Sequence, residues 1–157
     1  MKHLERHYSR LAPAQLFDLV ADVEQYPDFL PWVIAAKVVR RQEKTMWTDL
    51  TMGTGFLHKQ FTTVALLDRP HRMEINSHDP IFERFEQIWT FEPAANGGTD
   101  IVYRVELKIK SPFLRAIVGL SIADGTKTMV AAYMRRAERL HGRQQSPVAA
   151  RGPSPTG

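Results

Sequence analysis

The chain has 157 residues, 43% of them hydrophobic and 10% aromatic, and its 21 lysines and arginines outnumber the 17 acids by four. This length suits one domain, and the apolar share excludes a wholly disordered chain. Having no cysteine, the chain has no disulfide framework, thiolate metal site or cysteine nucleophile. No apolar run approaches the ~20 residues that cross a bilayer, and the first residues lack the core of a secretory signal. We therefore expect a cytoplasmic protein that is at most peripheral to the inner membrane.

The chain is expected to begin with a strand followed by short helical segments. Residues 2–9 alternate loosely between apolar and polar types, as a strand does. Apolar residues with helical spacing follow Pro13, a residue that suits a first helical turn. This helix should end near Tyr26, because Pro27 disfavours a helical residue before it. Residues 28–32 should be irregular, since Pro31 interrupts them.

Six strands are expected next, because β-branched and aromatic residues are enriched and alternate with polar ones. In residues 83–92, the side chains of Phe85, Gln87, Trp89 and Phe91 share one face. Asn96-Gly97-Gly98 is the strongest turn signal in the chain. The expected strands are residues 33–42, 46–52, 56–67, 73–76, 83–92 and 101–109.

A long amphipathic helix should close the domain. Apolar residues recur at i, i+3 and i+4 over residues 112–140, and Ser111 with Pro112 suits a helix start. Residues 143–157 hold three prolines and two glycines, with one large aliphatic side chain, so we expect a disordered tail. The domain is then residues 1–142, and it keeps only +2 of the +4 charge because the tail holds two arginines and no acid.

This order of elements predicts an α+β fold, because the helices are segregated from an antiparallel run of strands. A meander of strands can curl around one long helix. The space between sheet and helix is then where a small apolar ligand would bind.

The sequence carries no strong catalytic or metal-binding signature. It has no nucleophile elbow, no phosphate-binding glycine loop and no dinucleotide fingerprint, and none of its six histidines forms a His-Glu-x-x-His pair. Asp49 and His58 are the acid–base candidates for a cavity, but an outward-facing Asp49 fits the strand pattern equally well. His78-Asp79 precedes Pro80, and we predict that this pair caps a turn.

Two groups of basic residues are candidates for contact with RNA, although nearby acids dilute both. The alternative is an ordinary helix face with pairs such as Arg135–Glu138. Because the domain is nearly neutral, we expect no DNA partner. The densest groups are Arg40-Arg41 and Arg135-Arg136 with Arg139.

Aromatic residues are spread over almost every expected element. The simplest interpretation is an aromatic-rich core. Three tryptophans exceed what a core of this size needs, however, and an apolar pocket for a flat or elongated ligand would use them well.

One segment, Val23 to Trp32 (VEQYPDFLPW), resembles the signature after the first helix of the coenzyme-Q-binding START-like family, within the polyketide cyclase and lipid-transport superfamily. The resemblance covers roughly residues 1–141. Val33 departs from it, because family members often have cysteine there. Three further segments support it: Phe61-Thr62-Thr63, Trp89-Thr90-Phe91-Glu92-Pro93 and Met129 to Ala137.

The resemblance implies a helix-grip (START/Bet v 1-like) fold, in which a curved antiparallel sheet wraps around a long C-terminal helix and short helices follow the first strand. It also implies a deep hydrophobic cavity. Eukaryotic relatives bind ubiquinone and support respiratory electron transport as lipid chaperones. Bacterial relatives include a ribosome-association toxin that binds the large subunit and blocks subunit joining, and the superfamily also holds polyketide cyclases.

Our first hypothesis is a non-enzymatic carrier that binds ubiquinone as a ligand, uses no catalytic cofactor and touches a membrane surface transiently. The second is a ribosome-association inhibitor that contacts RNA through Arg135, Arg136 and Arg139, and the third is a cyclase-type enzyme. Gln87 or Tyr103 would hydrogen-bond a quinone carbonyl, and residues 29–32 would form a lid or a membrane-touching edge. The residues expected to line the site, from strand and helix parity, are Leu30, Trp32, Phe56, Phe61, Gln87, Trp89, Phe91, Tyr103, Ile117 and Met129.

Overall fold

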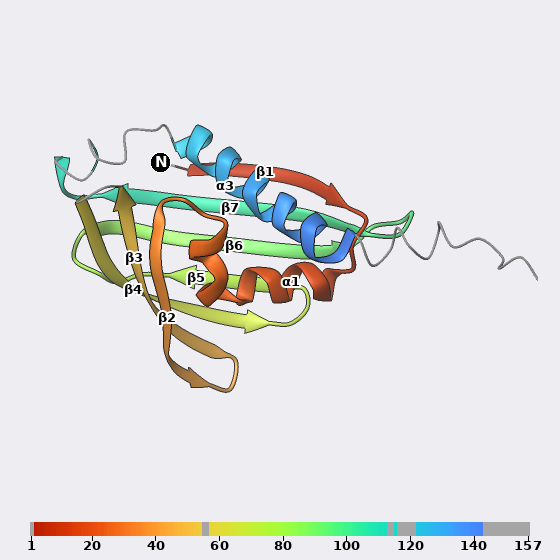
Figure 1. Ribbon diagram of the computed structural model, residues 1–157, viewed down its shortest axis with the longest axis horizontal. Helices are drawn as coiled ribbons and strands as arrows, with labels where there is room; N and C mark the ends of the chain where they lie inside the picture. The colour runs from red at the N-terminus through yellow and green to blue at the C-terminus, as the bar shows by residue number, and fades with distance from the viewer. Residues whose placement is uncertain (1, 55–56, 113–114, 116–121, 143–157) are drawn as a thin grey trace, which may run out of the picture.

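The computed structural model describes residues 2–54, 57–112, 115 and 122–142 (Figure 1). Seven strands, two α-helices and two other helical segments are described within these residues. In chain order they are β1 (Lys2–Ser9), α1 (Pro13–Ala21), the 3₁₀ helix η1 (Val23–Asp28), β2 (Val33–Gln42), β3 (Thr45–Thr54), β4 (Leu57–Asp68), β5 (Arg72–Asn76), β6 (Phe82–Pro93), β7 (Thr99–Ile109), α3 (Ile122–Ala137) and the π-helical turn η2 (Glu138–Gly142).

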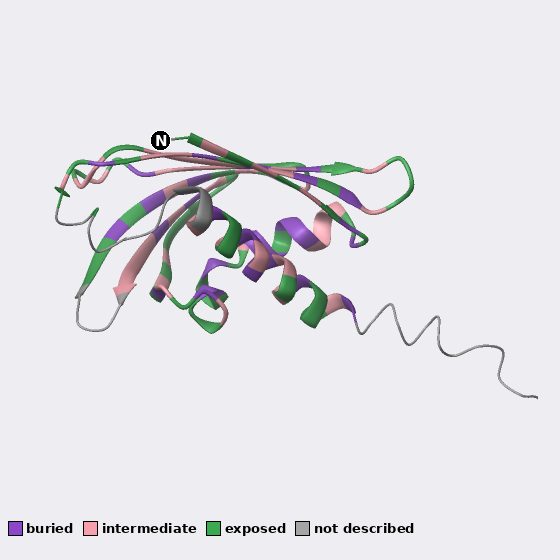
Figure 2. Ribbon diagram, turned by 90° about the horizontal axis from the view of Figure 1, so that it is seen from above, coloured by how far each residue is buried: buried purple, intermediate pink, exposed green. Residues whose placement is uncertain are grey.

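The strands form one antiparallel sheet in the order β1-β7-β6-β5-β4-β3-β2. Strands β2 to β7 are a meander, and β1 joins it beside β7, so that β1 and β2 are the two edges. Figure 2 shows the sheet curving over the helices, which lie on its concave side. The predicted α+β fold, a curved sheet around a C-terminal helix with short helices after the first strand, is confirmed.

The concave face of the sheet, called the inner face below, is apolar where the helices cover it. Met73 of β5 lies opposite Trp89 of β6, which lies opposite Tyr103 of β7, and all three are at most 1% exposed. Opposite residues in antiparallel strands point to the same face, so this row is continuous. The alternation predicted for residues 83–92 is therefore confirmed.

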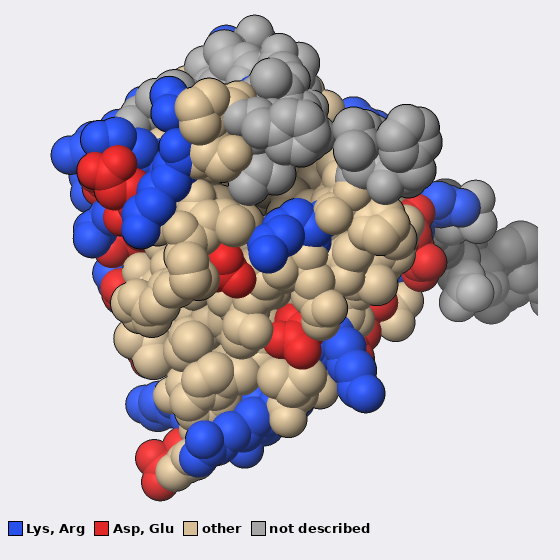
Figure 3. Space-filling view, turned by 90° about the vertical axis from the view of Figure 1, so that its left-hand side faces the viewer, with Lys and Arg blue, Asp and Glu red and all other residues tan. Residues whose placement is uncertain are grey.

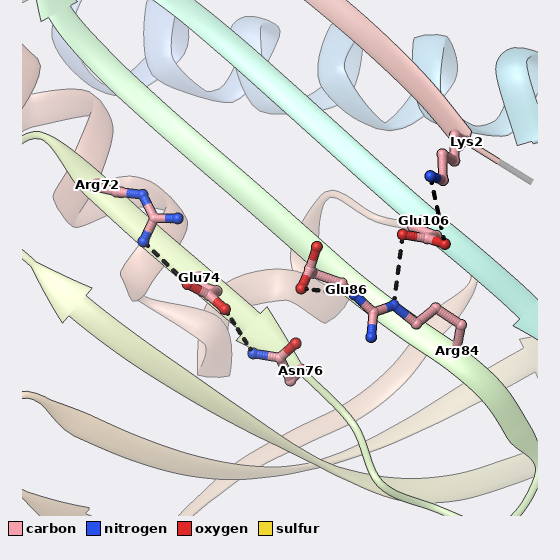
Figure 4. Close-up of polar contacts among 7 residues, drawn as sticks. All are labelled: Lys2, Arg72, Glu74, Asn76, Arg84, Glu86 and Glu106. Atoms are coloured by element: carbon pink, nitrogen blue, oxygen red, sulfur yellow. Dashed lines mark hydrogen bonds and ion pairs between the residues drawn. The ribbon is translucent and has the colours of Figure 1, made fainter.

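The convex face, called the outer face, carries charged side chains that pair within and across the strands. Such exposed pairs are worth little individually, about 0–1 kcal/mol, but they keep polar groups on the solvent side. The pairs on β1, β5, β6 and β7, drawn in Figure 4, are Lys2–Glu106 (3.9 Å), Arg84–Glu106 (3.5 Å), Arg84–Glu86 (3.2 Å) and Arg72–Glu74 (3.0 Å).

The first helix is shorter than predicted, because α1 ends at Ala21 instead of near Tyr26. The chain leaves the α conformation at Asp22 (φ −83°, ψ 65°) and continues as η1, which contains Pro27. A 3₁₀ helix has three residues per turn, so residues i and i+3 share a face. Val23 and Tyr26 are both buried on this shared face.

Two glycines allow the tight turn between β6 and β7. Gly97 and Gly98 adopt φ values of +89° and +78°, which side chains with a Cβ rarely adopt. A Cβ at Gly98 would also collide with the carbonyl oxygen of Ser9. The turn predicted at residues 96–98 is thus confirmed, and it brings the start of β7 against the end of β1.

Helices α1 and α3 close the core over the inner face. Phe17 of α1 meets Phe91 of β6 edge-on, with ring centroids 6.1 Å apart, and Tyr133 of α3 meets Trp89 at 5.2 Å. The described part of the predicted closing helix is confirmed, whereas its residues 113–114 and 116–121 and the predicted tail, 143–157, lie outside the described residues. Within the described ranges, no helix has the length and apolar character needed to span a bilayer.

Candidate functional site

Four aromatic rings form what we call the core aromatic cluster: Trp89, Phe91, Tyr103 and Tyr133. The Trp89 ring lies 4.4 Å from Tyr103 and 5.2 Å from Tyr133, and it is nearly parallel to Phe91 at 5.9 Å. All four side chains are at most 3% exposed. This cluster is therefore packed interior beneath α1 and α3.

A second group, the end aromatic cluster, consists of Phe61 on β4 with Phe82 and Phe85 on β6. Its ring centroids are 4.9 to 5.7 Å apart. It is not part of the contiguous buried core, and Phe82 and Phe85 are only half-buried. The two clusters thus leave a stretch of inner face between them.

Half-buried apolar side chains occupy this stretch, which we call the inner strip. They pack against the core on one side and are incompletely covered on the other. At Gly125 of α3, an added Cβ would meet no atom of the described residues within 4 Å. The strip is thus a half-buried, partly open apolar stretch beside the packed core. Its members are Trp32, Leu50, Met52, Ile75, Leu107 and Met129.

Gln87 and Thr48 are inner-face polar side chains with no hydrogen-bond partner among the described residues, as is His7 Nε2 on β1. Gln87 of β6 lies between Ile75 and Val105 in the sheet and is half-buried. Thr48 of β3 is 1% exposed, and its buried hydroxyl lacks a partner. Unpaired buried polar groups are costly, so such groups are candidate ligand contacts. The sequence prediction included Gln87 but missed Thr48. Thr48 lies two residues from both Met46 and Leu50 in β3, and this spacing indicated that it shares their inner face.

Three buried tyrosines beside the core aromatic cluster are neutral at physiological pH. Burial raises the pKa of the Tyr103 and Tyr133 phenols well above its usual value. Tyr26 donates a hydrogen bond to the Val20 carbonyl, and burial raises its pKa as well. These phenols can hydrogen-bond or pack, but they supply no proton-transfer group near pH 7.

The acid–base candidates do not lie at the inner strip. Asp49 is on the outer face, where its Oδ1 accepts a hydrogen bond from the Thr62 hydroxyl at 2.7 Å. His58 is exposed near the start of β4. Asp79 Oδ1 accepts a hydrogen bond from the Ile81 amide at 3.0 Å, so the predicted capping is confirmed for Asp79, whereas His78 is exposed.

The inner face of β1 carries a separate ionisable cluster. His3 Nε2 lies 2.6 Å from Glu5 Oε1, and His7 Nε2 lies 3.4 Å from Glu5 Oε2. The hydrogen bond to His3 lowers the pKa of Glu5, with Lys127 of α3 and the charge of both histidines adding to the effect. No group of three or more potential ligands with metal-site geometry occurs in the described part of the chain.

The residues predicted to line the site fall into different environments. Leu30, Trp89, Phe91 and Tyr103 are interior, and Phe61 lies in the end aromatic cluster. The half-buried ones are Trp32, Gln87 and Met129, while Phe56 and Ile117 lie outside the described residues.

The segment 29–32 is not a detached lid. Leu30 is 2% exposed, and Phe29 meets both Tyr26 and Tyr133 edge-on, at 5.8 and 5.4 Å. Trp32 also packs against the core. Its apolar side chains hold this segment in place because they point inward.

The basic group on the closing helix is less accessible for contact with RNA than the sequence indicated. Arg136 is half-buried, with its guanidinium 5.5 Å from the centre of the Phe29 ring. Arg135 and Arg139 are exposed. The predicted Arg135–Glu138 pair is wrong, because Glu138 reaches across to Arg10, 2.9 Å away, on the segment before α1.

Two surface hollows lined by described residues lie elsewhere. One, of about 310 Å³, is bounded by residues of β1 and β7, and the other, of about 290 Å³, lies around Thr62 and His78. Neither contains a residue that was predicted to contact a ligand.

Comparison with known proteins agrees with this architecture. A family model for polyketide cyclase/dehydrase and lipid transport matches residues 10–134. The ribosome association toxin RatA of Pseudomonas aeruginosa is 33% identical over 141 residues, 89% of this chain and 98% of that one. The mitochondrial coenzyme Q-binding protein COQ10 homolog B of Xenopus laevis is 27% identical over 140 residues. The match covers 87% of this chain but only 57% of that relative.

A solved structure, TTHA0849 from Thermus thermophilus, has the same fold. It superposes with a TM-score of 0.74 at 19% identity, covering 89% of this chain and 99% of that one. Sheet, helices and family match agree over nearly all of the described residues. The chain belongs to the polyketide cyclase/dehydrase and lipid transport family.

Proposed function

We propose that this protein binds an isoprenoid quinone, ubiquinone, along the inner strip and carries it chemically unchanged. The observation that carries this proposal is the partly open apolar strip between the two aromatic clusters. A polyprenyl tail is insoluble, and removing it from water contributes about 25 cal/mol per Å² of apolar area. A strip of aliphatic and aromatic side chains suits such a tail.

The polar groups on the inner face suit the quinone ring. The Gln87 amide would donate a hydrogen bond to one carbonyl oxygen, and the Thr48 hydroxyl is a further donor on the same face. Tyr103 suits this role less well, because its ring packs 4.4 Å from Trp89 inside the core. With the phenols neutral and Asp49 on the outer face, the strip offers binding groups without a catalytic base.

The relative from Xenopus is named as a coenzyme Q-binding protein, which supports the choice of ligand. A carrier must exchange its lipid with a membrane, so we propose transient contact with a membrane surface and a role in respiratory electron transport. A cyclase activity is not proposed, because neither Asp49 nor His58 lies at the inner strip.

Lipid extraction tests the quinone proposal. Protein purified from a ubiquinone-producing host should carry ubiquinone that organic extraction and mass spectrometry identify. Gln87→Leu, which keeps an apolar strip, should fold normally but bind about fivefold more weakly, as loss of one hydrogen bond of about 1 kcal/mol implies. A folded protein that carries no quinone and takes none up from vesicles would refute the proposal.

A second candidate function is association with the large ribosomal subunit. Its support is the relative named a ribosome association toxin, which matches over nearly the full length of both chains. Sedimentation of ribosomes with and without the protein tests it. The expected result is a loss of joined ribosomes and comigration of the protein with large subunits, and an unchanged profile would dismiss this function.

A further inference from the structure

The hairpin of β2 and β3 carries a group of exposed cations, with Asp49 opposite Lys37 as a nearby acid. Lys37, Arg40, Arg41 and Lys44 are all exposed, and none forms an ion pair with another described residue. Glu43 is the one acid in residues 37–44. The outer face of β5 and β6 differs, because Arg72 and Arg84 pair with glutamates there (Figure 4). Clustered, unpaired cations favour a polyanionic partner.

One of these cations lies over an aromatic ring. The Arg40 guanidinium carbon lies 4.6 Å from the centre of the Trp47 ring, and Arg40 Nη2 donates a hydrogen bond to Gln42 Oε1 at 2.7 Å. The two contacts fix the plane of the guanidinium group. Unstacked RNA bases stack on arginine planes and aromatic faces, so this pair is a preformed platform for a base.

The hairpin also has the shape of a projecting arm. Its tip is the lowest part of the molecule in Figures 1 and 3, and Lys and Arg side chains gather there in Figure 3. Strand β2 is an edge of the sheet, so no further strand covers it. A strand of nucleic acid could therefore approach the arm at its free edge and tip, where the cations of both sides are within reach.

We propose that this hairpin binds single-stranded RNA, with phosphates on Lys37, Arg41 and Lys44 and a base on the Arg40–Trp47 pair. The inference deepens the ribosome-association proposal, because ribosomal RNA would be the natural source of such a strand. The proposed RNA contact is therefore on the hairpin and not on α3, where the Arg136 guanidinium packs over the Phe29 ring.

The arrangement of charge favours RNA over an anionic membrane. Arg40 lies opposite Trp47 on the outer face, whereas Arg41 lies opposite the buried Met46, so the cations occupy both sides of the ribbon. A flat lipid surface would meet only one side. The tip residues 41–44 are all polar, and a membrane-binding tip would present apolar side chains for insertion.

Fluorescence anisotropy with a labelled twelve-nucleotide single-stranded RNA tests the proposal over a range of KCl concentrations. The double variant Arg41→Gln/Lys44→Gln should bind about tenfold more weakly at 0.1 M salt, with a salt slope smaller by about 1.4 for two lost phosphate contacts. The matched control, Arg135→Gln/Arg139→Gln on α3, should bind within about twofold of the wild type. Equal losses in the two variants, or no binding by the wild type, would overturn the proposal.

A charge-conserving variant tests the stacking platform. Arg40→Lys keeps the charge but removes the guanidinium plane, so it should bind RNA about fivefold more weakly with an unchanged salt slope. Unchanged affinity would remove the base-stacking part of the proposal. Binding of the wild type to phosphatidylglycerol vesicles but not to RNA would overturn the whole proposal in favour of a membrane.

The same variants, sedimented with purified large ribosomal subunits, separate the two proposals. If the wild type binds RNA through the hairpin but does not bind subunits, ribosome association fails and the RNA surface stands. If the hairpin variant retains both RNA and subunit binding, the RNA surface fails and ribosome association stands.

Discussion

Gln87 and Thr48 are the polar residues that matter most for the proposed ligand, and their environments differ. Gln87 is half-buried at the inner strip, so a ligand could reach its amide without disturbing the core. Thr48 is 1% exposed and carries an unpaired hydroxyl. An unpaired buried hydroxyl costs about 1–3 kcal/mol, which a bound carbonyl oxygen would recover. Gln87 is therefore the more accessible group. A hydrogen bond from the ligand to Thr48 would recover more free energy, because its hydroxyl is buried without a partner.

Glu5 gives the protein a pH dependence that can be measured. Its pKa is lowered in the folded state by the hydrogen bond to His3, so it stabilises the fold above its unfolded pKa and loses that effect as the pH falls through the folded pKa. Glu5→Gln should therefore be less stable at pH 7 by about 1 kcal/mol, and the difference from the wild type should shrink below about pH 4.5.

Thermal denaturation at pH 7, 5 and 3.5 measures this difference. Glu92→Gln, at an exposed position near the end of β6, is the matched control and should follow the wild type at every pH. A constant gap between Glu5→Gln and the wild type across the three pH values would contradict the assignment.

At the scale of elements, α3 has an open position at Gly125, one helical turn before Met129 of the inner strip. Gly125→Leu adds a side chain where the described residues leave space, and it replaces a residue that weakens a helix by about 1 kcal/mol relative to alanine. We expect an unchanged or higher melting temperature and at least about tenfold weaker quinone binding, because the new side chain occupies the ligand's place.

Gly125→Ala is the control, since it gains helix propensity with little added volume. It should raise the melting temperature while binding quinone nearly as well as the wild type. If Gly125→Leu binds normally, the ligand does not pass this part of α3.

At the scale of the whole molecule, the inner face divides into packed interior and a partly open strip. Trp89→Ala should cost about 3–5 kcal/mol, as for other large core side chains, which is a large part of a typical total stability. Phe85→Leu, in the half-buried end aromatic cluster, should cost about 1 kcal/mol and weaken quinone binding severalfold. Urea denaturation and a quinone-uptake assay measure the two effects.

From the sequence, Trp89 was expected to line the ligand site. Its contacts with Tyr103 and Tyr133 make folding the larger effect of its loss. A stable Trp89→Ala protein with lost quinone binding would instead place Trp89 in the ligand site.

Much of the fold was determined by local pattern. The strict alternation in residues 83–92 and 101–109 predicted both strands and their buried faces, because side chains of a strand alternate between solvent and core. The glycines at 97 and 98 predicted their turn, because few other residues adopt positive φ. The α+β class followed from the order of these elements.

Only the tertiary structure decided which inner residues are packed and which remain reachable. Trp89 and Gln87 share a face of β6, yet α1 and α3 bury one and leave the other half-exposed. The alternation of side chains along a strand predicts which face of the sheet a residue is on. It does not predict which residues cover that face, because these are far away in the chain. For the same reason the Arg10–Glu138 pair appeared only when distant segments came together.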